Sequence, residues 1–386
     1  MEIVAWLVVL LVAVPVLTFV VECIAGAAPT RDRAPAAPPP PFAVIMPAHN
    51  EAAGIAAAVS GALAQLRAVD RLLVVADNCT DDTALIARSL GAEVIQRHSE
   101  TERGKGFALA AGRAALATAG LRVVVVLDAD CSAEPGALQR LAAEAVRTRA
   151  AVQGCYLLTN EDKHSAAQLS AFAFVVKNLV RQRGLQRLGA PALLQGSGMA
   201  FPWPLFQGAR LASASLAEDM ELGIELLLAK HEVRFLASAR FTSAASARGA
   251  MIVQRTRWEH GTVATGWRYA PALIAAGLRG RRRLLALAFD LIVPPLALLA
   301  VLQLAAMVLA GGVALSGGSP APLIAAAVVV AAFVISIGWA WHRAGRDYLS
   351  LGTLLRIPGY VLWKLPIYGR LLVDRQRAWI RTSRDG

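Results

Sequence analysis

Residues 123–130 read VVVVLDAD, an unbroken apolar run that ends in two aspartates, Asp128 and Asp130. A short, wholly apolar run rich in valine predicts a β-strand buried on both faces, as in a parallel sheet covered by helices. Ligands of open α/β sheets bind beyond the carboxyl ends of the strands. Two carboxylates one residue apart at that place can share a divalent cation, and hard oxygen ligands suit Mg²⁺ or Mn²⁺.

The two aspartates also have a simpler interpretation. Asp and Ser side chains often cap helices, and the segment Ser132–Pro135 leads into a helix predicted over Pro135–Arg147. An Asp-x-Asp pair also occurs by chance. The metal site therefore needs support from the rest of the chain.

Strand-like and helix-like segments alternate from Phe42 to about Tyr269. Besides Val123–Leu127, strands are predicted at Phe42–Met46, Leu72–Ala76, Glu93–Gln96 and Val152–Leu157. Helices are predicted between the strands, at Gly54–Leu66, Asp82–Leu90, Gly104–Ala117 and Pro135–Arg147. Such alternation predicts an α/β domain, a mostly parallel sheet with helices on both faces.

Polar residues follow two more of these strands, at the same rim of the predicted sheet. The sequence Pro47-Ala48-His49-Asn50-Glu51 comes after the first strand, and Asp77 comes after the second. Asp77 can accept a hydrogen bond from the base or ribose of a nucleotide. It can equally stabilise its own turn by bonds to the backbone.

Two further charged residues stand at predicted helix starts. Lys105 lies between two glycines, where it can meet a phosphate, although a solvated lysine is the alternative. Ser215 and Glu218 match a capping box that opens a helix to about Lys230. Asp219 lies in the first turn of that helix, where a carboxylate tends to stay ionised. An ionised carboxylate near a sugar hydroxyl can act as a general base.

The segment Gln254-Arg255-Thr256-Arg257-Trp258 combines two arginines with an aromatic ring. Arginine pairs well with diphosphate oxygens, and the flat apolar face of tryptophan suits a sugar ring. The alternative is an amphipathic helix at a membrane surface, in which arginine extends its charge toward water and tryptophan lies at the interface.

The composition excludes a wholly soluble protein. The chain has 386 residues, of which 56% are apolar and 17% charged, with a mean hydropathy of +0.51. Soluble domains carry about 25% charged residues. The abundance of apolar side chains also excludes disorder over most of the length. The excess apolar residues should lie in membrane segments.

Three stretches are long and apolar enough to cross a bilayer, which takes about 20 residues as a helix. They are Ile3–Ala25, Leu284–Leu315 with a kink at Pro294–Pro295, and Pro322–Trp341. Asp290 in the second stretch is expected near the cytoplasmic end, in contact with water. A cleaved signal peptide is the alternative for the first stretch. Against this alternative, the acidic Glu2 precedes the apolar run and no basic residue does.

Charge predicts how the chain is oriented. Lys and Arg outnumber Asp and Glu by 39 to 27 overall and by 13 to 4 in Ala276–Gly386. Cytoplasmic flanks of membrane spans are enriched in Lys and Arg, so Arg31, Arg33 and the basic flanks of the other spans predict a multi-pass protein of the cell (inner) membrane with a cytoplasmic middle domain. The basic excess fits anionic lipid. No nucleic-acid-binding motif accompanies it, so nucleic acid is not expected as a partner.

These features divide the chain into five parts. We expect an N-terminal transmembrane helix (1–28), a Pro-rich linker (29–41), a cytosolic domain (42–270), two transmembrane helices with basic flanks (271–345) and a basic tail (346–386). The tail mixes aromatic and basic residues as interfacial helices do, and a short re-entrant segment is the alternative. The four cysteines form no C-x-x-C pair, which indicates reduced thiols rather than disulfides.

Taken together, the motifs resemble those of the membrane-bound family 2 inverting glycosyltransferases, a group that includes cellulose, hyaluronan and poly-N-acetylglucosamine synthases. The motifs that carry the resemblance are, in order, Pro47-Ala48-His49-Asn50-Glu51, Asp77, Lys105, Asp128-x-Asp130, Glu218-Asp219 and Gln254-x-x-Arg257-Trp258. The resemblance covers about Phe42 to Tyr269 and implies a GT-A-like fold.

The resemblance implies how the donor is held. Ala48, Asn50 and Glu51 of the first loop would bind the uridine together with Asp77. Lys105 would meet the diphosphate of the donor.

It also implies a metal and a base. Asp128 and Asp130 would bind the nucleotide and the cation, Mg²⁺ or Mn²⁺, with Asp130 the more direct ligand. Asp219 would deprotonate the acceptor hydroxyl. The anomeric configuration would invert, and no nucleophile from the enzyme would be needed.

On the acceptor side, Arg257 would steady the leaving diphosphate and Trp258 would line the acceptor site, with Gln254 of the same motif among the substrate-binding residues. The segment Gln195–Ala200 resembles the small-residue segment that lies near the acceptor in this family. A core strand with a tight glycine turn is the alternative for that segment.

The implied activity is transfer of a hexose from a nucleotide-diphosphate donor, in the first place a UDP-sugar, to a growing polysaccharide such as an exopolysaccharide. Single addition to a lipid-linked acceptor is the alternative, because three spans give little material for an export channel. The implied partners are the donor, a glycan or lipid-linked acceptor, membrane lipid, and an export or polymerisation partner protein.

Two other classes of protein fit less well. A non-catalytic sensor of glycans or nucleotides would lack at least one of Asp130, Asp219 and Arg257, and the chain has all three. A transporter of small solutes would need more spans and polar groups at mid-membrane.

Overall fold

The computed structural model describes residues 1–29, 38–159, 165–212, 215, 217–244, 248–362, 365 and 368, without the side chains of 166 and 248–257. The described residues form two compact units. The helical unit comes from the segments Met1–Pro29, Asn160–Ala190 and Arg248–Gln376. The sheet unit comes from Thr30–Thr159 and Pro191–Ala247.

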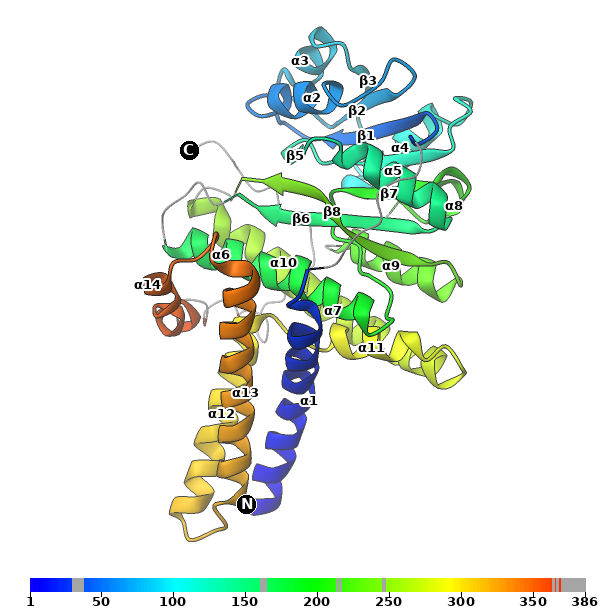
Figure 1. Cartoon of the computed structure of the whole chain (residues 1–386). Helices are drawn as coiled ribbons and strands as arrows, with labels where there is room; N and C mark the ends of the chain where they lie inside the picture. The colour runs from blue at the N-terminus through cyan, green and yellow to red at the C-terminus, as the bar shows by residue number, and fades with distance from the viewer. Residues whose placement is uncertain are drawn as a thin grey trace. The chain divides into compact units, whose positions relative to one another are not determined.

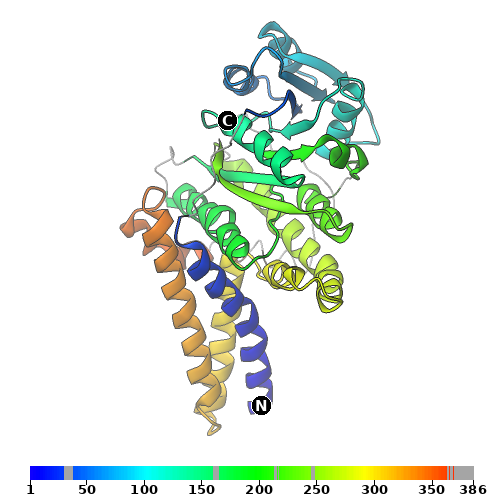
Figure 2. The same ribbon diagram turned by 45° about the vertical axis from the view of Figure 1, so that its right-hand side comes forward.

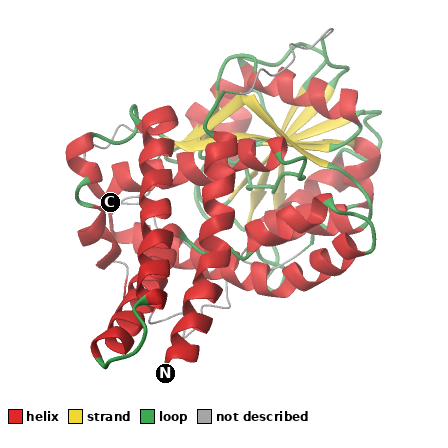
Figure 3. Ribbon diagram, turned by 60° about the horizontal axis from the view of Figure 1, so that its bottom comes forward, coloured by secondary structure: helices red, strands yellow, loops and turns green. Residues whose placement is uncertain are grey.

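The sheet unit contains one eight-stranded sheet in the order β3-β2-β1-β4-β7-β6-β8-β5 (Figure 1). Its strands are β1 (Phe42–Ala48), β2 (Arg71–Asp77), β3 (Glu93–Arg97), β4 (Val123–Val126), β5 (Cys131–Ala133), β6 (Ala151–Leu158), β7 (Met199–Pro202) and β8 (Val233–Ser243). Its helices are α2 (Ile55–Leu63), α3 (Thr83–Ser89), α4 (Lys105–Ala115), α5 (Ala137–Thr148), α8 (Trp203–Gly208) and α9 (Glu218–Leu228). Figure 3 shows the strands fanning out as one twisted sheet.

The apolar runs of the sequence form the centre of this sheet. Val123–Val126 is fully buried, as is Phe42–Met46 beside it. The two strands pair in parallel, with Ile45 opposite Val126. Burial of both faces explains why these strands are continuously apolar rather than alternating, and all five predicted strands lie within two residues of the observed bounds.

The sheet is mixed: most of its strand pairs are parallel, as predicted, and the others are antiparallel. β1, β2, β3 and β4 are parallel neighbours, and β6 is parallel to β8. However, β7 runs antiparallel to both β4 and β6, and β5 runs antiparallel to β8. The two antiparallel strands span only four and three residues, too short to show a strand period in the sequence.

The helical unit comprises the remaining helices. They are α1 (Glu2–Gly26), α6 (Ser165–Val175), a π-helical turn (Val176–Arg181), α7 (Gln182–Arg187), α10 (Arg248–Leu278), α11 (Arg283–Leu291), α12 (Leu296–Leu315), α13 (Ala321–Ala340), a second π-helical turn (Trp341–Gly345) and α14 (Leu351–Leu354). Among the described residues, three helices are long and apolar enough to cross a membrane: Glu2–Gly26, Leu296–Leu315 and Ala321–Gly345. They run side by side (Figures 1 and 2).

The second predicted span, Leu284–Leu315, is divided in the structure. α11 ends at Leu291 and α12 begins at Leu296, on either side of Pro294–Pro295. Proline lacks the N–H that continues a helix, and it disfavours helical geometry in the residue before it. The expected kink is therefore a break, and only the part from Leu296 onward has the length and hydropathy of a span.

A buried ion cluster joins three segments of the helical unit. The Arg181 guanidinium contacts Glu22 Oε2 at 2.6 Å through Nε and Asp290 Oδ1 at 2.5 Å through Nη2. All three residues are buried. The expectation that Asp290 would be in contact with water is wrong, because this carboxylate is paired with an arginine inside the protein.

Parts of the predicted linker and tail lie outside the described residues. These include Arg31, Arg33, Trp363, Lys364 and Arg370. The described start of the tail contains α14. Ser350 is the N-cap of this helix, and its Oγ accepts a hydrogen bond from Thr353 N. The interfacial role of the tail stays a prediction.

Candidate active site

The strand ends that carry polar residues lie at one edge of the sheet. β1 lies between β2 and β4 and is parallel to both, so all three carboxyl ends point the same way. Asp77 ends β2, and Asp128 follows β4 by two residues. Neighbouring strands are about 4.8 Å apart, so the strands that lead to these two aspartates are separated by about 10 Å.

Lys105 contacts two groups at this edge from the first turn of α4. Its ammonium forms an ion pair with Asp128 Oδ1 and donates a hydrogen bond to Gly196 O at 2.7 Å. Gly104 precedes it with φ +126°, a backbone conformation that favours glycine. The glycine-flanked lysine of the sequence is therefore held in place by two partners rather than left free in solvent.

Gly196 is the point at which three charged side chains meet. A Cβ atom there would lie 3.1 Å from Asp219 Oδ2, 3.6 Å from Lys105 Nζ and 3.9 Å from Asp128 Oδ2. The three side chains come from α9, from α4 and from the loop after β4. A Cβ at 196 would be crowded by the Asp219 carboxylate alone and would make ordinary contact with the other two, and the φ of +92° also favours glycine.

Asp219 lies in the first turn of α9, as predicted, but the capping box does not form. The helix begins at Glu218 with Ala217 as its N-cap, without a side-chain cap. Ser215 Oγ instead accepts a hydrogen bond from Ala217 N at 3.3 Å. Asp219 Oδ1 accepts from the adjacent Met220 N at 2.8 Å, which orients the carboxylate at the helix N-terminus.

Asp128 and Asp130 are placed to share a cation. Together with Cys131 they offer ligand atoms that all lie within 4.8 Å of one another. Burial, and then the negative charge of the two aspartates, raises the pKa of the Cys131 thiol well above its usual range. The two carboxylates supply the hard oxygen ligands of this set. Their oxygen chemistry fits Mg²⁺ or Mn²⁺.

The capping alternative for these aspartates does not hold. α5 begins at Ala137 with Gly136 as its N-cap and no side-chain cap. Cys131–Ala133 forms the strand β5 between the aspartates and that helix.

Negative charge exceeds positive charge in this cluster. Burial lowers the pKa of Lys105, but Asp128, Glu218 and Asp219 raise it by more, so the ammonium stays charged. Burial raises the pKa of Asp128, and Asp130 and Asp219 raise it further against the opposing effect of Lys105. Several carboxylates thus face one ammonium, which is the electrostatic setting of a cation site.

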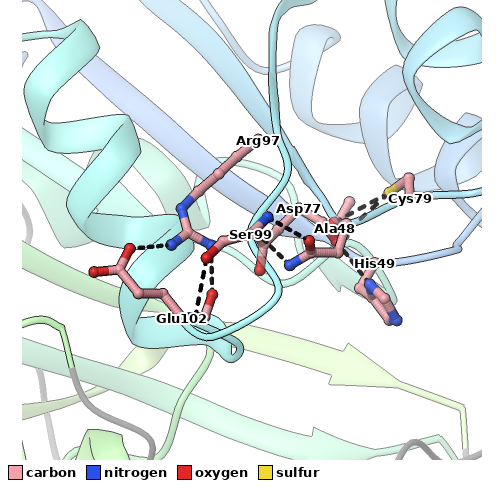
Figure 4. Close-up of polar contacts among 8 residues, drawn as sticks. Ala48, His49, Asp77, Cys79, Arg97, Ser99 and Glu102 are labelled. Atoms are coloured by element: carbon pink, nitrogen blue, oxygen red, sulfur yellow. Dashed lines mark hydrogen bonds and ion pairs between the residues drawn. The ribbon is translucent and has the colours of Figure 1, made fainter.

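Asp77 is held by an arginine from the next strand (Figure 4). Its Oδ1 accepts hydrogen bonds from Arg97 Nη1 at 2.8 Å and from Asn78 Nδ2 at 3.2 Å. The same guanidinium contacts Glu102 Oε2 at 2.6 Å. His49 Nδ1 lies 2.7 Å from the backbone oxygen of Asp77. The carboxylate is therefore fixed on one side before any ligand is present.

The loop after β1 is tied to the loop after β2. Ala48 is buried at the end of β1. Asn50 has φ +54°, and its Oδ1 accepts a hydrogen bond from Thr80 N at 2.7 Å. Glu51 N donates to Thr83 Oγ1 at 2.8 Å. The first two strand ends thus form one joined surface beside Asp77.

A comparison with family models identifies the family of this chain. Residues 39–261, more than half of the chain, match the family model described as glycosyltransferase like family 2. The chain belongs to this family. The finer resemblance to cellulose and hyaluronan synthases stays a prediction.

Relatives support the family over part of the chain. An uncharacterised glycosyltransferase of Mycobacterium tuberculosis (strain ATCC 25618 / H37Rv) is 41% identical over 101 residues, which are 26% of this chain and 42% of that protein. The match thus spans less than half the length of this curated relative.

A solved structure has a similar fold. The mannosyltransferase PcManGT from Pyrobaculum calidifontis, in complex with GDP-Man and Mn²⁺, has a TM-score of 0.53 and 18% identity over 95% of both chains. Glucosyl-3-phosphoglycerate synthase from Mycobacterium tuberculosis has a TM-score of 0.39 and 21% identity, covering 57% of this chain and 76% of that one. The first similarity shows a shared fold over nearly the whole length of both chains.

The last predicted motif, Gln254-x-x-Arg257-Trp258, lies in the helical unit. Gln254 and Arg257 belong to α10, and their side chains lie outside the described part of the structure. The ring of Trp258 packs on Phe174 of α6, with centroids 5.3 Å apart and planes tilted by 53°. The roles assigned to these residues stay predictions.

One residue at this edge was not predicted. Arg97, the last residue of β3, holds Asp77, and the strand-end rule that selects Asp77 would have selected it too. Ser197 belongs to the segment Gln195–Ala200, for which the resemblance implied a place near the acceptor. Its Oγ accepts a hydrogen bond from Asp128 N at 3.0 Å, a contact that depends on how β7 enters the sheet and has no signal in the sequence.

Proposed function

We propose that this glycosyltransferase is a membrane-bound, metal-dependent enzyme that transfers a sugar from a nucleotide diphosphate, in the first place a UDP-sugar, with inversion. The observation that carries the proposal is the meeting of Lys105, Asp128 and Asp219 around Gly196, with Asp130 beside Asp128. A cation site, an ammonium and a carboxylate base are the groups that such a transfer needs.

Asp128 and Asp130 would hold the divalent cation. When bound there, Mg²⁺ or Mn²⁺ would neutralise the negative charge that grows on the diphosphate as it leaves. The mannosyltransferase that shares the fold is in complex with GDP-Man and Mn²⁺, which supports this assignment. Lys105 would add a second positive charge on the donor side of the cluster.

Asp219 would act as the general base. The acceptor oxygen forms a bond to the anomeric carbon, and its proton passes to the Asp219 carboxylate. The bond from that carbon to the donor phosphate breaks, and its electron pair leaves with the diphosphate. Attack from the face opposite the leaving group inverts the configuration. Asp219 lies in the first turn of α9, where the helix dipole interacts favourably with a carboxylate.

The nucleoside would bind at the joined loops beside Asp77. Asp77 is fixed by Arg97, and the Ala48–Glu51 loop is tied to the loop after β2. Arg257 is proposed to steady the diphosphate, and Trp258 with Gln254 to line the acceptor side. These last three assignments rest on the order of the motifs in the sequence.

The acceptor is proposed to be a growing polysaccharide. A single addition to a lipid-linked acceptor is the second candidate, favoured by the finding of three candidate spans in the described chain, little material for a channel. In both cases we place the enzyme in the cell (inner) membrane, with the sheet unit in the cytoplasm. This placement follows from the basic flanks of the spans.

A donor panel tests the proposal. The full chain, purified in detergent, is incubated with radiolabelled UDP-sugars and GDP-mannose, and the products are separated by size. We expect transfer from one donor, loss of transfer with EDTA, and recovery with Mn²⁺ or Mg²⁺. Long products indicate polymerisation and single additions indicate the second candidate. Transfer that continues in EDTA contradicts the metal assignment.

A further inference from the structure

Gln153 is a polar side chain in the interior of the sheet unit. It lies in β6, every residue of which is buried, and Gln153 itself is fully buried. Glutamine is mostly exposed in proteins, because burial of an amide is unfavourable unless its hydrogen bonds are replaced. The bonds that replace them show what this side chain does.

The amide of Gln153 binds the loop Gln195–Gly198 from both of its ends. Nε2 donates to Ser197 O at 2.9 Å and to Gly154 O at 2.8 Å, with Gly198 O at 3.4 Å. Oε1 accepts from Gln195 N at 2.8 Å. The side chain thus pairs with a backbone donor and a backbone acceptor of the loop, as a neighbouring strand would.

The opposite side of the same loop carries two contacts to the donor site. Gly196 O accepts the hydrogen bond from Lys105 Nζ at 2.7 Å, and Ser197 Oγ accepts from Asp128 N at 3.0 Å. The loop is therefore a bridge, with Gln153 on its inner side and Lys105 and Asp128 on its outer side.

The sheet supports only the last residue of the loop. β7 begins at Met199, and the backbone bonds to the neighbouring strands extend back to Gly198, where Gly198 N donates to Val126 O at 3.0 Å and Gly198 O accepts from Gly154 N at 2.8 Å. Gly196 and Gly198 both have positive φ. Glycine has more backbone freedom to lose than any other residue, so this stretch would sample other conformations without a partner for residues 195 and 197.

We infer that Gln153 is a positioning residue, which sets the Lys105 ammonium and the Asp128 backbone for the donor through the loop Gln195–Gly198. The inference rests on the proposed function of the acidic cluster as the donor site. A positioning role differs from a purely structural one in what it predicts. If Gln153 positions the site, loosening the loop changes donor and metal binding in protein that is still folded.

The test compares Gln153→Met with Ser197→Ala. Methionine is close to glutamine in size and unbranched, so Gln153→Met removes the amide bonds with little change in volume. Ser197→Ala keeps the Gln153 contacts, which go to the Ser197 backbone, and removes the hydroxyl that accepts from Asp128 N and contacts Cys131. For each variant we measure the thermal midpoint, the Mn²⁺ affinity with UDP present, and kcat and donor KM.

We expect Gln153→Met to lower kcat/KM by about tenfold or more, since small displacements in a site have large effects, and to weaken Mn²⁺ binding. Ser197→Ala should act in the same direction by about threefold. The double variant should be no worse than Gln153→Met, because both changes act through one loop and are not additive.

Gln139→Met is the matched control. Gln139 lies in α5, and its amide also donates to a backbone carbonyl, that of Gln65. This change should shift the thermal midpoint and leave Mn²⁺ affinity, kcat and KM as they are.

The outcomes separate this inference from the proposed function. If Gln153→Met is folded and retains its Mn²⁺ affinity, kcat and donor KM, the inference is overturned while the function stands. If Gln153→Met does not fold, unchanged kinetics and Mn²⁺ binding in Ser197→Ala overturn it instead. If the wild-type chain shows no metal-dependent transfer with any donor, the proposed function is contradicted, and the inference about Gln153 falls with it.

Discussion

A cation among carboxylates lies in each unit of this chain, Arg181 in the helical unit and Lys105 in the sheet unit, and the two clusters differ in how far they are exposed to solvent. Arg181 of the helical unit contacts Glu22 and Asp290, with side chains only 9%, 1% and 7% exposed. In the sheet unit, the side chains of Lys105 and Asp128 are 18% and 27% exposed. The first cluster is closed to water and the second is partly open.

The difference indicates different tasks. The guanidinium is a planar fork that can bind two carboxylates at once, which suits a permanent buried pair. Lysine carries a compact charge with fewer fixed directions. Around Lys105 the carboxylates are in excess and partly accessible. We therefore expect the Arg181 cluster to stabilise the fold and the Lys105 cluster to bind a ligand.

The largest effect is expected at the open cluster. Asp219→Asn should lower kcat by about 10³-fold, because it removes a general base, a group that typically contributes 10²–10⁴-fold. Donor and Mn²⁺ binding should persist, since neither is assigned to Asp219. Initial rates together with UDP binding by calorimetry check both parts. Full activity in this variant would remove the base assignment.

The closed cluster should affect stability instead. Arg181→Met leaves Glu22 and Asp290 buried without their cation, and breaking a buried pair from one side costs about 3 kcal/mol or more. Denaturation in detergent measures the loss, and kcat of the folded fraction should stay the same. Replacing Glu22, Arg181 and Asp290 together by apolar residues should recover most of the stability. Loss of kcat without loss of stability would reverse the comparison.

The sheet unit also contains a buried carboxylate, that of Asp70. We expect it to make the free energy of unfolding depend on pH. The Asp70 side chain is fully buried and accepts hydrogen bonds from Arg67 and from Phe42 N. Burial raises its pKa, but these bonds lower it by more, so the pKa of Asp70 lies below its usual value.

A pKa lowered by folding means that the ionised form stabilises the fold above the usual pKa of about 3.9, and that this contribution is lost as pH falls through the lower folded value. Asp70→Asn should therefore cost about 2 kcal/mol at neutral pH, and less as the pH falls below about 4. Urea titrations of both proteins across that range measure the difference. A constant difference at all pH values would contradict the ionic origin.

The smallest effect is expected for Arg97, which holds the Asp77 carboxylate at the edge of the sheet. Arg97→Gln removes the charged partner of Asp77 and should raise the donor KM by about tenfold, the value of one charge-assisted hydrogen bond, with kcat nearly unchanged. Arg71→Gln is the control, because Arg71 pairs with Glu93 at the exposed start of β2. An equal rise in KM in both variants would show a general loss of fold.

The sequence was informative where physical constraints are local. Buried strands must be apolar, so the runs that form β1, β2 and β4 could be bounded to within two residues, and the strand-end rule located Asp77 and Asp128. β8 was missed although its burial alternates along Val233–Ser243, a period that its sequence shows in part. The capping box at Ser215 failed because the helix begins three residues later.

The contacts that complete the site could not be predicted. Lys105 and Asp219 meet only because Gly196 turns with positive φ between them, and no local pattern specifies which distant loop fills that place. The pairing of Asp290 with Arg181 is similar, since 109 residues separate the two. Both depend on packing between segments far apart in the chain.

The central claim is that the cluster around Gly196 binds a divalent cation together with a nucleoside diphosphate. Mn²⁺ titration of the purified chain, followed by the EPR signal of free Mn²⁺ with and without UDP, tests it most directly. We expect binding that UDP tightens, a loss of about tenfold or more in Asp130→Asn, and no change in Glu144→Gln, an acidic residue paired with Arg147 on α5. Equal Mn²⁺ affinity in the wild type and in folded Asp130→Asn would contradict the claim.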